Sequence, residues 1–282
     1  MNKNRIFGVL AIAAIVGVGA YIYTSSNPKT PTVATAPQVE AEQTQENAEV
    51  EALEPVATAL PAPTKQESDH PPSPPQEPLK SQPPKSLENS DKAVKKGAKQ
   101  LSQQLVAWLT PEEQIRKWVF LVNSFGQGNM PIKNLPLNFP SKPFQVSTAD
   151  GHKRLSASNY SRGEILINAL LSVDVDLLFR YYSAWSPLLE TAYGELGQGG
   201  SFEQTLLGAL DQVMAIDADA ATNAKLEQPS VFYKYIDPEL ENASDLEKFF
   251  WRLGPDNTQK LQQFSEQLKL KIQSNLVDQD GG

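Results

Sequence analysis

The sequence VDVDLLFRYYSAWSPLLETAYGELG, at residues 173–197, decides the fold class of this chain. Its apolar and aromatic residues recur three and four positions apart, which is the period of an α-helix with one buried face. Pro187 has no backbone N–H to donate, so we expect a kink or a break near Trp185. The aromatic residues between Phe179 and Tyr193 are expected in the core rather than in a ligand groove.

Similar patterns on both sides of this stretch predict further helices, with caps at Ser201 and, through the letters TPEE, at Thr110. We expect these helices at residues 90–109, 110–126, 165–171, 201–216, 244–253 and 256–273. The sequence therefore predicts an all-α fold, a single C-terminal helical domain of about seven helices. That domain spans residues 87–276 and is followed by a disordered tail at 277–282.

A long segment at residues 127–160 interrupts the helical pattern. Its four prolines exclude a helix, although the letters FQVS at 144–147 could form a short strand. Long loops inside a compact domain are uncommon and often functional, so this segment is a candidate for a role in function.

The N-terminal part predicts a membrane tether. Residues 1–5 are basic and precede Ile6–Tyr23, an uncharged apolar stretch long enough for one transmembrane helix. A cleaved signal peptide is the alternative, with Val18 and Ala20 at the cleavage site. Residues 24–86 hold 13 of the 22 prolines and predict a disordered Pro-rich linker. We expect a single-pass inner-membrane protein with a cytoplasmic N-terminus and a periplasmic domain.

Composition excludes several kinds of site. The chain has no cysteine and only two histidines, His70 and His152, which argues against thiol chemistry and against a multi-histidine metal centre. The net charge of −8 argues against nucleic acid as a partner. We expect no cofactor and no bound metal.

The letters SVFYKYIDPELE, at residues 230–241, hold the densest group of polar and aromatic residues. Lys234 could act as a general base only if burial lowered its pKa by several units. Asp237, followed by proline, is typical of a helix N-cap, and the following glutamates suit the first turn of a helix. A structural role for this stretch is therefore favoured over proton transfer.

Four ordered motifs support a resemblance to a known family: PEEQIRKWVFLVNSF, YSAWSPLLETAYGELG, QPSVFYKYIDPELE and WRLGPDNTQKL. With them, nearly all of residues 87–275 resemble the bacterial envelope family catalogued as domain of unknown function 3014. Leu253 stands where that pattern leads us to expect methionine, a conservative change. The resemblance implies one membrane span and a Pro-rich linker, and it carries no assigned reaction. It points to a shared surface at Tyr233, Lys234, Asp237 and Arg252.

These patterns leave three functions open. The first is a binding or scaffold module that docks on an envelope protein or a cell-wall component. The second is an envelope enzyme using carboxylate or lysine chemistry at Asp237, Glu241 or Lys234. The third is a structural tether for a membrane partner. No recognisable catalytic constellation is present, so the binding module is the prediction.

Overall fold

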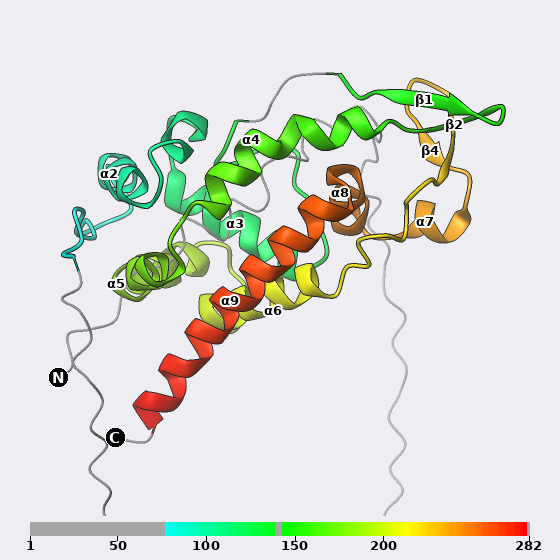
Figure 1. The fold of residues 1–282 in the computed structure, drawn as a ribbon. Coiled ribbons are helices and arrows are strands. Elements are labelled where there is room, and N and C mark those ends of the chain that lie inside the picture. Colours follow the sequence, from blue (N-terminus) through cyan, green and yellow to red (C-terminus); the bar gives the residue numbers. More distant parts are fainter. Residues whose placement is uncertain (1–76, 139–142, 281–282) are drawn as a thin grey trace, which may run out of the picture. The chain divides into compact units, whose positions relative to one another are not determined.

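The computed structural model describes residues 77–138 and 143–280. Figure 1 shows its helices and a small sheet. The helices are α2 (Asp91–Leu101), α3 (Gln114–Gly126), α4 (Tyr160–Leu171), α5 (Val175–Gly194), α6 (Phe202–Met214), α7 (Pro238–Asn242), α8 (Asp245–Leu253) and α9 (Pro255–Asp280). The strands are β1 (Val146–Ala149), β2 (His152–Leu155), β3 (Lys225–Glu227) and β4 (Lys234–Tyr235).

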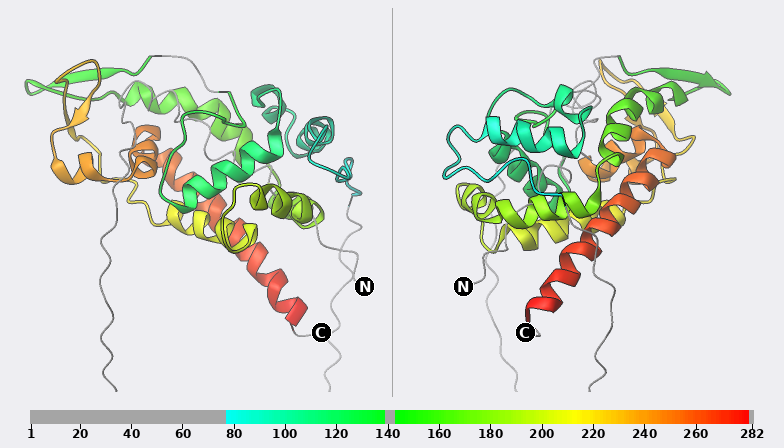
Figure 2. Two further views of the ribbon diagram at one scale, coloured as in Figure 1. Left: turned by 180° about the vertical axis from the view of Figure 1, so that it is seen from behind. Right: turned by 60° about the vertical axis from the view of Figure 1, so that its left-hand side comes forward.

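The core is built by α3, α5, α6 and α9, which pack against one another. The long helix α9 runs across the front of the helices in Figure 1 and lies behind them in the view from the opposite side in Figure 2. The aromatic residues of α5 are all buried, as expected: Phe179, Tyr181, Tyr182, Trp185 and Tyr193. Of the kink or break expected near Trp185, the break is wrong, because α5 continues through Pro187 to Gly194. Proline has no N–H to donate within the helix, and the buried residues on both sides of it offset that cost.

Ordered residues lie on both sides of the segment 87–276. Leu79 packs against the core and Ser81 is buried, donating its hydroxyl to the Ala93 carbonyl at 2.8 Å. At the other end α9 continues as a helix to Asp280. The span expected at residues 6–23 lies outside the described residues. Among the residues that the structure describes, no helix is both long and apolar enough to cross a membrane.

The prediction of an all-α fold is confirmed only in part, because the described residues are mostly helical but also form a small sheet. Eight α-helices lie in the described residues, and with them an antiparallel sheet in the order β1-β2-β3-β4. β1 and β2 are joined by a two-residue turn, in which Asp150 has φ 53° and Gly151 has φ 74°. Two positive φ values define the type I′ turn, whose twist matches that of a hairpin. The hairpin falls in the segment that the sequence assigned to an irregular loop, and only its strand near residues 144–147 was expected.

The start of α3 also differs from the prediction. The helix begins at Gln114 rather than near Thr110, and its N-cap residue Glu113 has φ 56° with no side-chain cap of its own. Asp91 of α2 caps it instead, accepting from the Glu113 amide at 3.1 Å and the Gln114 amide at 2.9 Å. A carboxylate from another helix satisfies the free amides and suits the helix dipole, so a local capping box is not needed.

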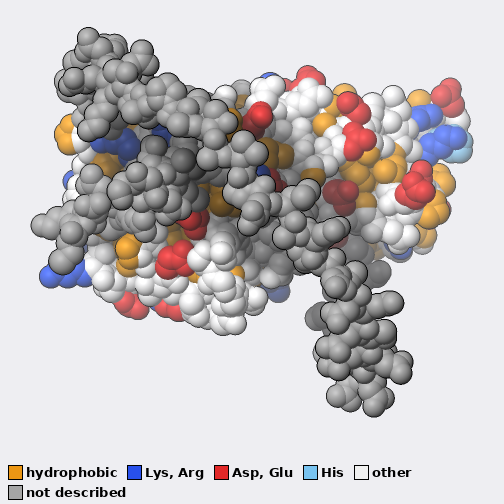
Figure 3. Space-filling model, turned by 90° about the horizontal axis from the view of Figure 1, so that it is seen from below, with side chains coloured by type: hydrophobic (Ala, Val, Ile, Leu, Met, Phe, Trp, Pro, Cys, Tyr) orange, Lys and Arg blue, Asp and Glu red, His pale blue; other side chains and the backbone are white. Residues whose placement is uncertain are grey.

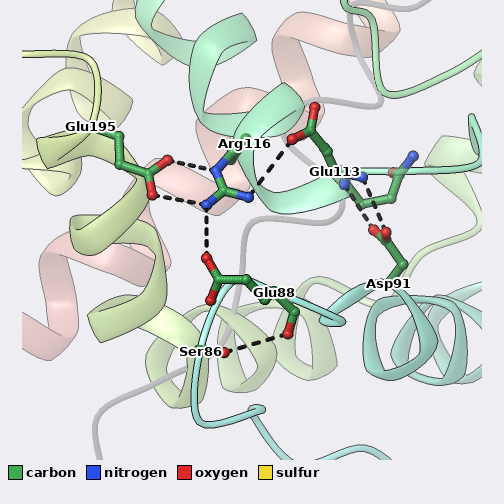
Figure 4. A network of polar contacts seen from close by, with 7 residues as sticks. Ser86, Glu88, Asp91, Glu113, Arg116 and Glu195 are labelled. Atoms are coloured by element: carbon green, nitrogen blue, oxygen red, sulfur yellow. Dashed lines mark hydrogen bonds and ion pairs between the residues drawn. The ribbon is translucent and has the colours of Figure 1, made fainter.

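Next to this cap, Arg116 joins three separate segments (Figure 4). Its guanidinium donates to both carboxylate oxygens of Glu195, at 2.6 and 2.9 Å, and reaches Glu88 at 3.4 Å and Glu113 at 3.8 Å. The hydrogen bond from Arg116 lowers the pKa of Glu195. The network therefore fastens the first residues of the domain to α3 and to the end of α5.

Candidate functional site

The structure places the four predicted surface residues in different environments. In β4 the side chains of Lys234 and Tyr235 point to opposite faces of the sheet, and Tyr233 directly precedes the strand. Lys234 is opposite Glu227 across the ladder. Arg252 belongs to α8 and is only 7% exposed, so it lies in the core beneath the sheet. The four residues therefore do not form one continuous surface.

Arg252 is brought together with Tyr235, a residue of the same stretch that was not among the four. The Arg252 guanidinium lies close enough to Tyr235 to act on the pKa of its hydroxyl. Burial raises the pKa of Tyr235, and the positive charge of Arg252 opposes this rise only in part. The ring of Tyr235 also packs edge to face on Trp251, with centroids 5.9 Å apart. These contacts fix the sheet to α8.

The turn between α8 and α9 completes this buried cluster. Gly254 has φ 90° and lies directly beneath the ring of Tyr160, where a Cβ would come within 2.5 Å of two ring atoms. Asn257 donates its amide to the carbonyls of Tyr160 and Leu253, at 3.1 and 2.9 Å. The residues WRLGPDN thus allow α4, α8 and α9 to pack closely where they meet.

The acidic residues of the stretch have structural partners. Asp237 is the N-cap of α7, as predicted, and accepts from the Glu239 amide at 2.9 Å. Glu241 accepts from the Tyr235 amide at 3.0 Å. Each carboxylate is thus used by the backbone near it, which favours the structural reading over proton transfer.

A second group of carboxylates lies at the start of α6 and is also structural. Glu190 accepts from the amides of Phe202 and Glu203, at 2.8 and 3.4 Å. Tyr182 donates its hydroxyl to Glu203 at 2.9 Å, and burial followed by the charge of Glu203 raises the pKa of Tyr182. Ser201 caps the helix as predicted, through the Gln204 amide. The carboxylates of this group lie at the N-terminus of α6, where the helix dipole favours negative charge.

The outer end of the sheet is the region with side chains left for a partner. Tyr233 packs on Phe144 with ring centroids 5.8 Å apart, and the Lys153 ammonium lies 5.1 Å from the Tyr233 ring centroid. On either side of Tyr233 in the sequence, Val231 is 78% exposed and Ile236 is 46% exposed. Figure 3 shows basic and histidine side chains at one end of the molecule, bordered by acidic and hydrophobic ones. We call Phe144, Lys153, Val231, Tyr233 and Ile236 the sheet-end surface.

Sequence reasoning missed part of this surface because it missed the hairpin. The signal was present in the letters ADGH, since Asp-Gly between short β-forming stretches is a strong indicator of a type I′ turn. No comparable signal brings Phe144 to Tyr233, because that contact depends on the pairing of β2 with β3.

The comparisons with known proteins give one match. No curated protein and no solved structure matches the chain. Residues 114–269, from the start of α3 into α9, match the model of the family described as "Protein of unknown function (DUF3014)". Because the match covers more than half of the chain, the chain belongs to this family.

Proposed function

We propose that this chain is a membrane-tethered envelope protein whose helical domain acts as a binding or scaffold module. Its docking region is the sheet-end surface, and its partner is another envelope protein. The proposal rests chiefly on the exposure of Val231 and Ile236, which lie on either side of Tyr233 in the sequence, and on the aromatic and cationic stack at Tyr233. Exposed aliphatic side chains next to aromatic and basic groups are the usual composition of a protein-binding surface.

The internal contacts support binding rather than catalysis. A catalytic carboxylate or lysine must be within hydrogen-bond reach of a substrate. Asp237 and Glu241 instead bind backbone amides, and Arg252 is held in the core by Tyr235. The tether is the part of the proposal that rests on sequence, through the apolar stretch Ile6–Tyr23.

Photo-crosslinking in cells tests the docking region. A photoreactive residue is placed at Val231 or Ile236, and at Leu270 of α9 as a control, because Leu270 is also an exposed aliphatic residue, at 60%. We expect one discrete protein adduct from the two sheet positions and none from Leu270. The same adducts from all three positions, or none from a folded and exported protein, would contradict the proposal.

The tether is tested separately by fractionation. The full chain should stay with membranes in alkaline carbonate, and a variant lacking residues 6–23 should not. Protease added outside the inner membrane should cleave the linker while the N-terminus remains protected. Release of the full chain by carbonate would argue for cleavage after Ala20 instead.

A further inference from the structure

The two edges of the sheet differ in whether their outward backbone groups are hydrogen-bonded. β4 forms one edge, and there Glu241 accepts a hydrogen bond from the Tyr235 amide at 3.0 Å. This side chain occupies a backbone donor that would otherwise be available to another strand. β1 forms the other edge. Among the described residues, none donates to or accepts from the outer side of β1.

The register shows which groups of β1 point outward. In a two-residue hairpin the residues beside the turn, Ala149 and His152, form a hydrogen-bonded pair, and bonded pairs then alternate along the ladder. The bond from the Ser156 amide to the Gln145 carbonyl, at 3.2 Å, fits this alternation. The N–H and C=O groups of Thr148 and Val146 therefore face away from β2.

β1 also lacks the devices that usually protect an edge strand. Its residues are Val146, Ser147, Thr148 and Ala149, with no charge, no proline and no bulge. The last three are exposed. Edge strands that must not pair commonly carry lysine, proline or a bulge. Among the described residues, β1 is protected by its shortness alone.

We propose that β1 is a docking edge, to which an extended acidic peptide segment of the partner adds as a fifth strand. This rests on the proposed binding function and names the form of the ligand. Thr148 and Val146 would supply the backbone hydrogen bonds that give affinity, as in other cases of strand addition. Side chains of the peptide would alternate between the two faces of the sheet.

On the sheet face that carries Ser147, the cations Arg154, Lys225 and Lys234 outnumber the carboxylate of Glu227, which favours an acidic ligand. Arg154 and Lys225 lie directly opposite each other across the β2–β3 ladder, a like-charge pair that is unfavourable by itself. Ser147 pairs with Arg154 on the same face, and its small side chain leaves room above it. An acidic residue of the peptide opposite Ser147 could reach the guanidinium, which has donors beyond those used by the Asn223 carbonyl and Asp150.

The same charges disfavour pairing of two copies through β1. Antiparallel pairing would place two Arg154–Lys225 pairs on one sheet. Four-residue strands also bury too little surface to offset that repulsion in a stable dimer. An acidic peptide adds no basic pair to the sheet, and it needs no large buried area because it does not have to hold a dimer together.

The test uses two labelled eight-residue peptides, one alternating valine with glutamate and one alternating valine with lysine, titrated against the full chain in detergent. Fluorescence anisotropy should show at least about tenfold tighter binding of the glutamate peptide.

Thr148→Pro removes an outward N–H and should weaken binding about tenfold without a change in Tm. Ser147→Pro removes a ladder bond instead, so its Tm should fall. The paired change Arg154→Gln and Lys225→Gln should abolish the preference for glutamate.

Amide exchange keeps the proposal falsifiable if Thr148→Pro does not fold. With the glutamate peptide bound, the amides of Val146 and Thr148 should exchange at least about tenfold more slowly. Unchanged exchange, equal binding of both peptides, or no binding at millimolar peptide would overturn the docking edge. Crosslinks from Val231 would survive such a result if the binding module itself is right, so the two failures can be told apart.

Discussion

Replacing Gly254 with alanine perturbs the junction of α4, α8 and α9 at its tightest point. Gly254 has φ 90° and ψ 158°, a backbone region that only glycine populates freely. Its missing side chain is also where Tyr160 packs, since a Cβ would lie 2.5 Å from the Cγ and Cδ1 atoms of that ring. The substitution therefore meets two obstacles, one in the backbone and one in the packing.

Each obstacle has a typical magnitude. A non-glycine residue held in such a backbone region costs about 1–3 kcal/mol. Forcing a methyl group against a packed ring costs about another 1–3 kcal/mol, because the ring must move. The expected loss for Gly254→Ala is thus about 2–6 kcal/mol, which is a large share of the roughly 5–15 kcal/mol that stabilises a typical domain.

Urea denaturation followed by circular dichroism measures this loss. Gly208→Ala is the matched control, because Gly208 lies in the interior of α6 with no atom within 4 Å of its Cβ position. That change should stabilise the chain by about 0.4–1 kcal/mol. Adding Tyr160→Ala to Gly254→Ala separates the two costs, since it relieves only the clash. A loss below about 1 kcal/mol for Gly254→Ala would refute the reasoning.

Two further changes test packing and charge. Gly97→Ala should lower stability by about 1–3 kcal/mol in the same assay, because its Cβ would lie 2.7 Å from the buried Tyr181 ring; a neutral effect would contradict this. Arg116→Gln tests the network of Figure 4. The hydrogen bond from Arg116 lowers the pKa of Glu195 below its ordinary 4.5, so its stabilisation is present above pH 4.5 and lost as the pH falls through the lowered value. The Tm difference between wild type and Arg116→Gln should therefore be largest near pH 7 and vanish in acid; a constant difference would argue against the ion pair.

The helices could be predicted because their signals are local. Apolar spacing located α5, α6, α8 and α9, and the stop at Gly254 before Pro255 was correct. The cap of α3 could not be predicted in this way, because Asp91 comes from another helix and no spacing rule relates it to Gln114. The local letters TPEE were therefore misleading.

The candidate site was predictable only in part, because the pairing of a strand with its neighbours determines which of its side chains share a face. Tyr233, Lys234 and Asp237 were found from their density in the sequence. The opposite faces of Lys234 and Tyr235 follow from the register of β3 with β4, which the sequence does not specify over two residues. Arg252 was expected at a surface, and its burial against Tyr235 depends on how α8 packs under the sheet.

The folded unit is larger than the segment that defines the family. The family match begins at Gln114, yet the amide of that residue is capped by Asp91, and Val94, Ala98 and Leu101 of α2 are buried in the same core. A fragment beginning at residue 114 would leave the start of α3 uncapped and expose the apolar surface that α2 covers. The residues before the matched segment are therefore part of the folded domain, and binding experiments need a chain that begins no later than Leu79.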